Sequence, residues 1–204
     1  MRRMGQIRRV CVYCGSSPGR DPAFLAAATR LGEALADAGV ALVYGGGSAG
    51  MMGAVATAVQ ARGGEIIGII PGFLTGRENV FRGATEVVVT KDMHERKRIM
   101  FERSDAFVAL PGGIGTLEEL VEQITWAQLG QHRKPILLAN IDGFWGGLLS
   151  VFEHMSRNGY IHSASRLNFL VTEDVEQIVP MLTAAAAKLT EEETAGEPEA
   201  VRRM

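Results

Sequence analysis

Residues Met93–Gly130 read MHERKRIMFERSDAFVALPGGIGTLEELVEQITWAQLG, and this stretch decides the fold. The apolar run 106–110 at its centre is typical of a buried β-strand, and the glycine-rich turn 111–116 follows it directly. Residues 117–129 then have the apolar spacing of an amphipathic helix. A strand, a glycine turn and a helix in this order bring free backbone N–H groups and the positive end of a helix dipole to one point. Such a point attracts an anion, most often a phosphate.

The charged residues of this stretch indicate what else the anion carries. A carboxylate at Glu119 would repel a phosphate bound beside it, so we expect Glu119 to point toward the rest of the ligand. Thr116 can cap the helix or hydrogen-bond the phosphate, and the paired glycines let the backbone approach an anion closely. The charges from Glu95 to Arg98 spread around a second helix, an arrangement that is equally typical of a solvated surface. A phosphate-binding turn, a cation and a carboxylate together predict that the ligand is a phosphorylated sugar whose anomeric carbon lies near the carboxylate.

Alternating strand and helix patterns in the rest of the chain predict the fold class. Strands are predicted over 9–14, 40–44, 65–70, 86–90, 106–110, 136–140 and 168–171, and helices over 22–38, 51–61, 92–103, 117–129, 146–158 and 175–189. This order means parallel strands that are joined by right-handed crossovers, with helices on both faces. The sequence therefore predicts one α/β domain with a Rossmann-like sheet over residues 1–190. The polar segment 191–204 is predicted to be a disordered tail.

The composition fits a protein that folds around an apolar core. Apolar residues make up 47% of the 204 residues, and the net charge of −2 implies no general attraction to nucleic acid or anionic membranes. We expect a cytoplasmic protein, because no run is apolar enough to span a bilayer and the basic N-terminus lacks the apolar stretch of a signal peptide. Cys11 and Cys14 form C-x-x-C in a strand pattern, where residues three apart face opposite sides. Structural thiols are therefore favoured over a redox pair or a metal site.

Three glycine-rich loops, 15–19, 45–50 and 112–115, follow predicted strands, and ligands of parallel sheets bind outside these carboxyl ends. The candidates for lining the ligand in the first two loops are Gly15, Ser16, Gly46, Gly47 and Met51. Loop 45–50 also matches the dinucleotide pattern G-x-G-x-x-G. The strand end about 20 residues further on, Ile69–Pro71, carries no carboxylate to hold a ribose, so NAD binding is disfavoured. The glycines either line a ligand or only allow a tight turn.

Two motifs make the chain recognisable. They are MHERK at 93–97 and PGGIGTLEE at 111–119, and TWAQLG at 125–130 extends the second. With CGSS at 14–17 and YGGG at 44–47, they resemble the LOG ("lonely guy") family of cytokinin riboside 5′-monophosphate phosphoribohydrolases as far as about Ile161. Members of this family were long mislabelled as lysine decarboxylases. That activity is disfavoured here, because the sequence has no motif for a pyridoxal phosphate site.

The resemblance implies a Rossmann-like fold, a homodimer, and no metal or redox cofactor. It implies Arg96 and Glu119 as the catalytic pair. It also implies a set of substrate contacts: Glu78, Arg96, Lys97, Gly113, Ile114, Gly115, Thr116, Leu117, Glu118, Glu119 and Thr125. Gly112 belongs to the loop that we expect to bind the phosphate, and Ile114 stands where plant members often have Tyr. The predicted helix 117–129, with its apolar face and Trp126, is the expected dimer interface.

The implied reaction is hydrolysis of the N-glycosidic bond of an adenosine 5′-monophosphate, with or without an N6 substituent, to free base and ribose 5-phosphate. By analogy with glycoside hydrolysis, Glu119 would stabilise a positively charged ribose and orient or deprotonate the attacking water. Arg96 would hold the ribose or phosphate and position Glu119. Two alternatives stay open: a general AMP nucleosidase of the same fold, and a non-catalytic carrier of a nucleotide or a molybdenum cofactor.

Overall fold

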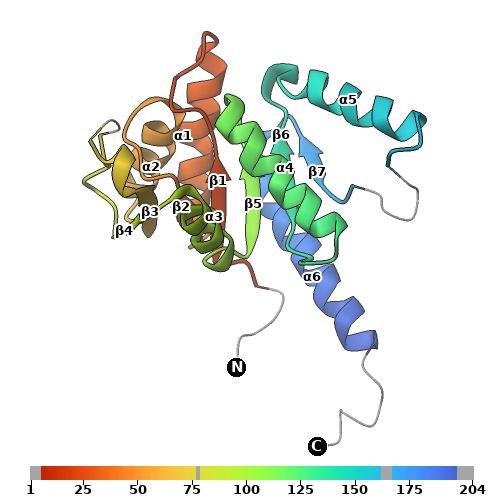
Figure 1. The fold of residues 1–204 in the computed structure, drawn as a ribbon. Helices are drawn as coiled ribbons and strands as arrows, with labels where there is room; N and C mark the ends of the chain where they lie inside the picture. Colours follow the sequence, from red (N-terminus) through yellow and green to blue (C-terminus); the bar gives the residue numbers. More distant parts are fainter. Residues whose placement is uncertain (1–5, 77–78, 162–166, 197–204) are drawn as a thin grey trace, which may run out of the picture.

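The computed structural model describes residues 6–76, 79–161 and 167–196 (Figure 1). Its strands are β1 (Arg9–Tyr13), β2 (Ala41–Tyr44), β3 (Ile66–Pro71), β4 (Glu86–Thr90), β5 (Ala106–Ala109), β6 (Ile136–Ala139) and β7 (Leu170–Thr172). Its α-helices are α1 (Pro22–Asp37), α2 (Gly50–Ala61), α3 (Met93–Glu102), α4 (Ile114–Gln128), α5 (Gly146–Arg157) and α6 (Ile178–Gly196). Short 3₁₀ turns within the described ranges are η1 (Gly72–Leu74), η2 (Ile141–Gly143) and η4 (Val175–Gln177). The predicted α/β class with a parallel sheet is confirmed.

The order of the strands places β1 at the centre of the sheet. The seven strands lie in the order β4-β3-β2-β1-β5-β6-β7, and each neighbouring pair is parallel. The chain first builds outward from β1 through β2, β3 and β4, and then returns to the other side of β1 with β5. In an open parallel sheet, ligands bind in the crevice where this direction reverses, outside the carboxyl ends of the strands. The fold therefore predicts a ligand site at the loops that follow β1 and β5.

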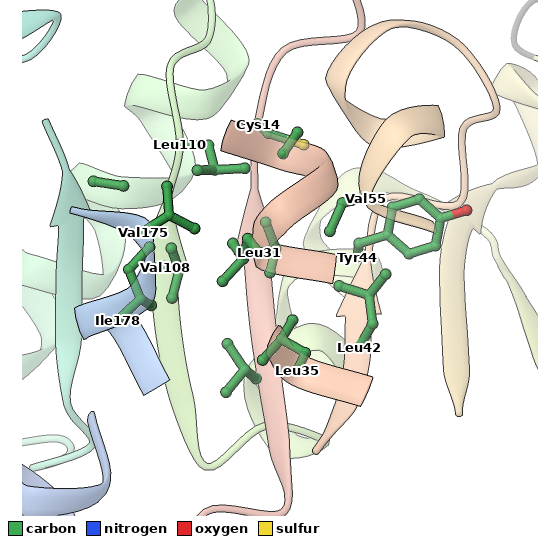
Figure 2. Packing of buried hydrophobic residues seen from close by; sticks show 14 of the residues in the cluster. Cys14, Leu31, Leu35, Leu42, Tyr44, Val55, Val108, Leu110, Val175 and Ile178 are labelled. Carbon is green, nitrogen blue, oxygen red and sulfur yellow. The ribbon is translucent and has the colours of Figure 1, made fainter. Parts of the chain in front are cut away.

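Helices cover both faces of the sheet, as the sequence predicts. Side chains from α1, α2 and α6 pack against one face, and Figure 2 shows this core around Leu31, Leu42 and Val108. Side chains from α3, α4 and α5 pack against the other face, and Figure 1 shows α4 crossing in front of the sheet with α6 behind it. Cys11 and Cys14 are buried free thiols in different clusters, on opposite faces, which agrees with their predicted structural role. None of the helices in the described part of the chain is long and apolar enough to cross a bilayer.

Two element boundaries differ from the prediction in a way that bears on function. Helix α4 begins at Ile114 instead of 117, because the last residues of the glycine turn already have helical geometry. Helix α6 continues to Gly196, beyond its predicted end at residue 189 and into the first part of the predicted tail. The alanines and the Lys, Leu and Glu residues of this region are strong helix formers, and they extend the helix despite its polar character. The remainder of the predicted tail, 197–204, lies outside the described residues.

Candidate active site

A cavity of about 290 Å³ lies at the carboxyl ends of β1, β2 and β5, where the fold predicts a ligand. The central strand and its loop contribute Val12, Tyr13, Cys14, Gly15 and Ser16, and the next loop contributes Gly45 with Met52 from α2. Helix α3 contributes Met93, Arg96 and Met100, and the start of α4 contributes Gly113, Ile114, Gly115, Thr116, Glu118 and Glu119. The two diagnostic sequence motifs therefore meet in one cavity, although they belong to different helices.

The first turn of α4 presents free backbone donors to this cavity. The N-cap residue Gly113 has extended backbone geometry and makes no side-chain cap, and the first amide that bonds back within the helix is that of Leu117, to Gly113 O at 3.0 Å. Among the described residues, the N–H groups of residues 113–116 have no hydrogen-bond acceptor. Four unpaired donors at the positive end of a 15-residue helix form an anion-binding position.

The preceding glycine closes this turn against the central loop. A Cβ atom at Gly112 would overlap the side chain of Thr116 and would lie 2.9 Å from the backbone nitrogen of Gly15. Only glycine allows the loops after β1 and β5 to approach so closely. Gly113 and Gly115 differ, because a Cβ at either position would meet nothing within 4 Å. Protein packing does not require glycine at these two positions, and close approach of a ligand to the backbone gives a reason for it.

The second glycine loop does not offer a comparable position, although its sequence matches a dinucleotide pattern. Gly15 O accepts hydrogen bonds from the amides of Met51 and Met52, at 3.1 and 3.3 Å, so the start of α2 is capped by the protein itself. The loop is also tied to a neighbouring segment, since Ser48 N donates to Asn79 O at 2.9 Å. Gly46 and Gly47 are buried and, with Met51, lie outside the lining of the cavity. These contacts agree with the disfavoured status of NAD binding.

Helix α3 is fixed at its start so that it carries cations inward. Asp92 caps the helix by accepting from Glu95 N at 2.8 Å, and Glu95 reaches back to accept from Lys91 N at 2.8 Å. This reciprocal arrangement resembles a capping box and gives Glu95 a structural role in the MHERK motif. Arg96 and Lys97 are buried, whereas Arg98 is exposed. The prediction of a solvated charge face holds for Arg98 alone among these three cations.

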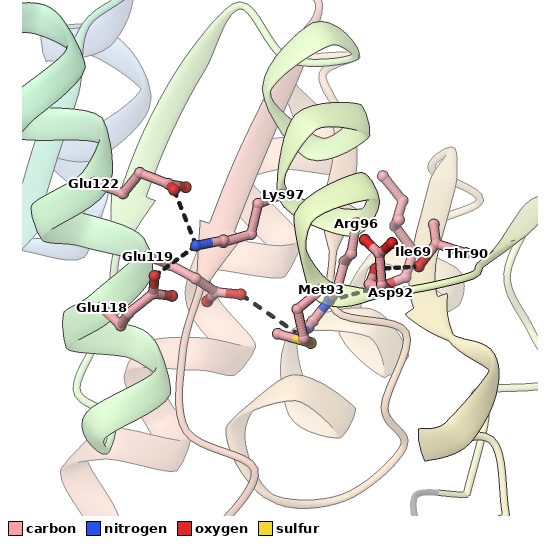
Figure 3. Close-up of polar contacts among 9 residues, drawn as sticks. All are labelled: Ile69, Thr90, Asp92, Met93, Arg96, Lys97, Glu118, Glu119 and Glu122. Atoms are coloured by element: carbon pink, nitrogen blue, oxygen red, sulfur yellow. Dashed lines mark hydrogen bonds and ion pairs between the residues drawn. The ribbon is translucent and has the colours of Figure 1, made fainter.

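Arg96 faces Glu119 across the cavity (Figure 3). Its Nε donates to the carbonyl of Ile69 at 3.1 Å, and its Nη1 lies 3.7 Å from Glu119 Oε1. A Cβ atom at Gly45 would overlap Nη2 of Arg96, so the absence of a side chain there leaves room for the guanidinium. The cation is held by the carbonyl of Ile69 and by the carboxylate of Glu119, which comes from a different helix. The structure thus brings the two residues of the predicted catalytic pair together.

Burial of Glu119 raises its pKa from 4.5 to about 7, because the charged form is poorly solvated there. Arg96 acts in the opposite direction, Glu118 raises the pKa, Lys97 lowers it and Glu122 raises it. Burial is the largest of these effects, and it outweighs the opposing effect of Arg96, so the carboxyl group retains a proton up to about neutral pH. A carboxyl group whose pKa is about 7 can exchange a proton with a substrate or a water molecule near neutral pH.

The structure separates the remaining predicted site residues into two groups. Gly113, Ile114, Gly115, Thr116, Glu118, Gly15 and Ser16 line the cavity. Gly112, Leu117, Lys97 and Thr125 do not line it: Leu117 packs toward the core, Lys97 binds carboxylates of α4, and Thr125 is exposed with its hydroxyl donating to Val121 O at 2.8 Å. Trp126 also lies outside the lining and packs edge-on against Phe101. Glu78 lies outside the described residues.

Sequence reasoning missed the contribution of Val12, Tyr13 and Cys14 to the cavity. The signal that could have found them is positional, because these residues end the central strand at the point where the sheet reverses direction. Three methionines, Met52, Met93 and Met100, also line the cavity. Among the described residues, no three His, Cys, Asp or Glu side chains are arranged to hold a metal ion.

Comparison with known proteins connects this geometry to one family. A family model described as "Possible lysine decarboxylase" matches residues 52–182. A protein of Oryza sativa subsp. japonica, named probable cytokinin riboside 5′-monophosphate phosphoribohydrolase, is 46% identical over 183 residues, which are 90% of this chain and 80% of the relative. A protein of Arabidopsis thaliana, named cytokinin riboside 5′-monophosphate phosphoribohydrolase, is 45% identical over 177 residues, which are 87% of this chain and 82% of the relative.

Solved structures share the fold at lower sequence identity. The molybdenum cofactor binding protein of Rippkaea orientalis superposes with a TM-score of 0.66 and 26% identity, over 88% of this chain and 97% of that one. The Moco carrier protein of Chlamydomonas reinhardtii superposes with a TM-score of 0.69 over 90% of this chain and 99% of that one. At 23% identity the second likeness concerns the fold alone. The same fold therefore occurs in proteins whose names describe different functions.

Proposed function

Because this chain belongs to the LOG family of cytokinin riboside 5′-monophosphate phosphoribohydrolases, we propose that it is an N-glycosidase acting on nucleoside 5′-monophosphates. The reaction adds one water molecule across the bond between C1′ of the ribose and the base nitrogen. Its products are the free base, a cytokinin when N6 carries the appropriate substituent, and ribose 5-phosphate. The curated relatives of this chain carry the name of this reaction.

The roles that we assign within the site rest on the closeness of the anion-binding position to the pair Arg96–Glu119. Four unpaired N–H groups at the start of α4 share a cavity with the buried pair of Arg96 and Glu119. A 5′-phosphate on these donors would place the ribose deeper in the cavity, toward Glu119, which lies further along the same helix. Binding the phosphate far from the reacting bond orients the ribose and contributes to catalysis without touching the base.

In this proposal, Glu119 acts on the carbon that loses the base. Its carboxylate would stabilise the positive charge that develops on the ribose and would orient or deprotonate the attacking water. Arg96 would hold the ribose or the phosphate and keep the carboxylate in place, since its Nη1 lies 3.7 Å from Glu119. Glu119 is only 8% exposed, so few water molecules compete for these interactions.

The proposed substrates are adenosine 5′-monophosphate and its N6-modified forms. Apolar side chains in the cavity could contact a substituent on the base. Met52, Met93 and Met100 line the cavity, and the exposed Ile114 lies at its edge. Methionine adapts to ligands of different shape, which also allows an unmodified adenine. Relative rates on AMP and on an N6-prenylated AMP separate a cytokinin-releasing enzyme from a general AMP nucleosidase.

A panel of nucleotides tests the proposed function. Purified protein is incubated with AMP, N6-isopentenyl-AMP, adenosine and IMP, and both free base and ribose 5-phosphate are quantified. We expect both products from at least one adenine nucleotide, and a kcat/KM for adenosine at least about 10²-fold below that for AMP, because the phosphate orients the ribose. Equal rates with adenosine and AMP would contradict the phosphate-binding role of α4. Binding of nucleotides without release of base would favour the carrier alternative.

We also propose that two copies of the chain form a homodimer through the α4–α5 side of the molecule. Helix α5 has no buried residue, although it packs on the sheet through Leu148, Leu149 and Phe152. It leaves Val151 and Met155 exposed, and α4 leaves Val121 exposed. The earlier expectation placed the interface on α4 and Trp126. The exposed apolar residues of α5 support extending the interface to that helix.

Sedimentation velocity tests the dimer. We expect the wild-type protein to sediment at twice the chain mass of 21.9 kDa, and the Val121→Glu/Met155→Glu variant to sediment as a monomer, because two charges would be buried at the interface. Val89→Glu is the matched control, since this valine is 60% exposed on β4 at the far edge of the sheet. A wild-type protein at the mass of one chain would reject this part of the proposal.

The proposal keeps the expected cytoplasmic location, with which two free thiols are compatible.

A further inference from the structure

Lys97 lies beside the proposed active site but does not line its cavity. It is only 9% exposed, and its Nζ contacts Glu118 Oε1 at 2.5 Å and Glu122 Oε1 at 2.9 Å. Figure 3 shows the side chain reaching from α3 to α4, with Glu119 on the same stretch of α4 pointing toward Arg96. Burial acts to lower the pKa of Lys97, but the hydrogen bonds to the two carboxylates outweigh it and raise the pKa. The ammonium group therefore stays charged.

We propose that Lys97 is a positioning residue: it binds the carboxylates on either side of Glu119 along α4 and thereby fixes the place and the charge of Glu119. Glu118 precedes Glu119 by one residue, and Glu122 follows it by three, so both lie within one helical turn of it. This role rests on the proposed function of Glu119. It differs from the substrate contact that the family resemblance implies for Lys97.

The partners of Glu122 show why the lysine is needed. Glu122 Oε2 is buried and has no hydrogen-bond partner among the described residues, and Lys97 is the cation that contacts its other oxygen. Glu122 is half-buried, and without a counter-ion its carboxylate would be poorly compensated and would also repel the charge of a carboxylate one turn away. Lys97 compensates this carboxylate and, through Glu118, ties α3 to the first turns of α4.

Other groups that face Glu119 belong to three elements. Arg96 and Lys97 come from α3, and Glu118 and Glu122 come from α4 itself. Cys11 and Tyr13 from β1, and Cys14 directly after it, lie within electrostatic range, and burial raises the pKa of each of them above its ordinary value, so they stay uncharged near neutral pH. The charge balance around Glu119 thus depends on two cations and two carboxylates, and Lys97 is the cation that contacts both carboxylates.

Four variants test this role: Lys97→Met, Lys97→Arg, Glu122→Gln and the double variant Lys97→Met/Glu122→Gln. Glu122 is chosen because it contacts Lys97 but does not line the cavity. For each protein, kcat and KM for AMP are measured from pH 5 to 9. The titration of Glu119 is followed directly by NMR in ¹³C-glutamate-labelled protein, where the resonance of Glu119 is identified by its loss in Glu119→Gln. The NMR measurement needs no activity, so a failure of the proposed reaction is distinguished from a failure of this inference.

We expect Lys97→Met to raise the pKa of Glu119 by about one unit and to lower kcat more than it raises KM, because two uncompensated carboxylates remain beside Glu119. Glu122→Gln is expected to lower that pKa, and the double variant to recover most of the wild-type titration and part of the lost kcat. Lys97→Arg is expected to keep the wild-type pKa. The inference is overturned if Lys97→Met changes KM alone and leaves the Glu119 titration in place, or if Glu122→Gln fails to compensate it. Should Lys97→Met not fold, an unshifted Glu119 resonance in Glu122→Gln overturns it equally.

Discussion

Glu119→Gln is expected to lower kcat/KM for AMP by at least about 10²-fold, the lower range for a positioned acid–base group, while the protein becomes more stable above neutral pH. The amide has almost the same shape as the carboxyl group, so it keeps the packing beside Arg96. It carries no charge and cannot accept a proton from water at neutral pH. A lower rate together with a higher stability would show that the carboxyl group of Glu119 contributes to catalysis but destabilises the folded protein.

The sign of the stability effect follows from the pKa of Glu119. Its pKa is about 7 in the folded protein and near the ordinary 4.5 in the unfolded chain, so between these values the folded state binds the proton more strongly. The contribution of this group to stability is fully present below about pH 4.5 and is lost as the pH rises through about 7. At pH 8 the charged form costs on the order of 3 kcal/mol, since one pKa unit corresponds to about 1.4 kcal/mol. Glu119→Gln removes this cost at pH 8, whereas at pH 5 it changes little.

Chemical denaturation at pH 5 and pH 8, together with the AMP assay, measures both effects on the same preparations. Glu102→Gln is the matched control, because its side chain is 61% exposed at the end of α3 and lies 4.0 Å from Arg98. It should change neither stability nor rate appreciably. Wild-type activity of Glu119→Gln would sink the catalytic assignment. Equal effects on stability at both pH values would show that the carboxyl group titrates in its ordinary range.

Arg96→Ala is expected to reduce kcat/KM by at least about 10²-fold as well, but to destabilise the protein. The variant leaves Ile69 O without its donor and Glu119 without its buried counter-ion. Removing one partner of a buried ion pair costs about 3–5 kcal/mol when the remaining charge cannot neutralise itself. Glu119 can take up a proton, so we expect the part of the cost that comes from its charge to be small at pH 6 and to approach this range at pH 8, whereas the loss of the donor to Ile69 O destabilises the protein at both pH values. The pKa of Glu119 should rise further in this variant, because Arg96 opposes the effect of burial.

The neighbouring arginine provides a control on the same helix. Arg98 has a 62% exposed side chain and forms only long ion pairs with Glu95 and Glu102, at 3.9 and 4.0 Å. Arg98→Ala should retain activity and most of the stability, because exposed ion pairs contribute little. Circular dichroism confirms folding before the rates of Arg96→Ala and Arg98→Ala are compared. If both variants retain wild-type rates, the orientation of α3 is not what places a cation in the site.

The sequence predicts the sheet well because apolar runs such as those of β2 and β6 are short, continuous and bounded by turn residues. It predicts the cavity at the start of α4 because a strand, glycines and a helix have a fixed geometric meaning. It does not predict which face of α3 turns inward, since four consecutive charges occupy every direction around the helix. Only the packing of α3 against α4 decides that Arg96 faces the cavity while Lys97 binds carboxylates next to it.

The tail shows a different limit. Residues 191–196 look polar enough to be irregular, but helix propensity acts locally and extends α6 without a need for further packing. Similarly, the sequence predicts the start of α4 at 117, because it does not show that Ile114, Gly115 and Thr116 already have helical backbone geometry. The turn that precedes them packs through Gly112 against Gly15, a contact between residues almost 100 positions apart. Short-range patterns contain no information on such a contact.

The carbonyl of Gly15 that caps α2 has a consequence for how genomes are searched. A screen for nicotinamide or flavin enzymes that relies on glycine spacing alone would select this chain through residues 45–50. Yet the carbonyl oxygen of Gly15, from another loop, already accepts hydrogen bonds from two amides at the start of α2, where such a screen assumes a bound pyrophosphate. Proteins selected by such a screen can be sorted by whether a main-chain carbonyl from a neighbouring loop accepts hydrogen bonds from the first amides of the helix. Those that have such a contact should not be assigned to the nicotinamide or flavin enzymes on glycine spacing alone.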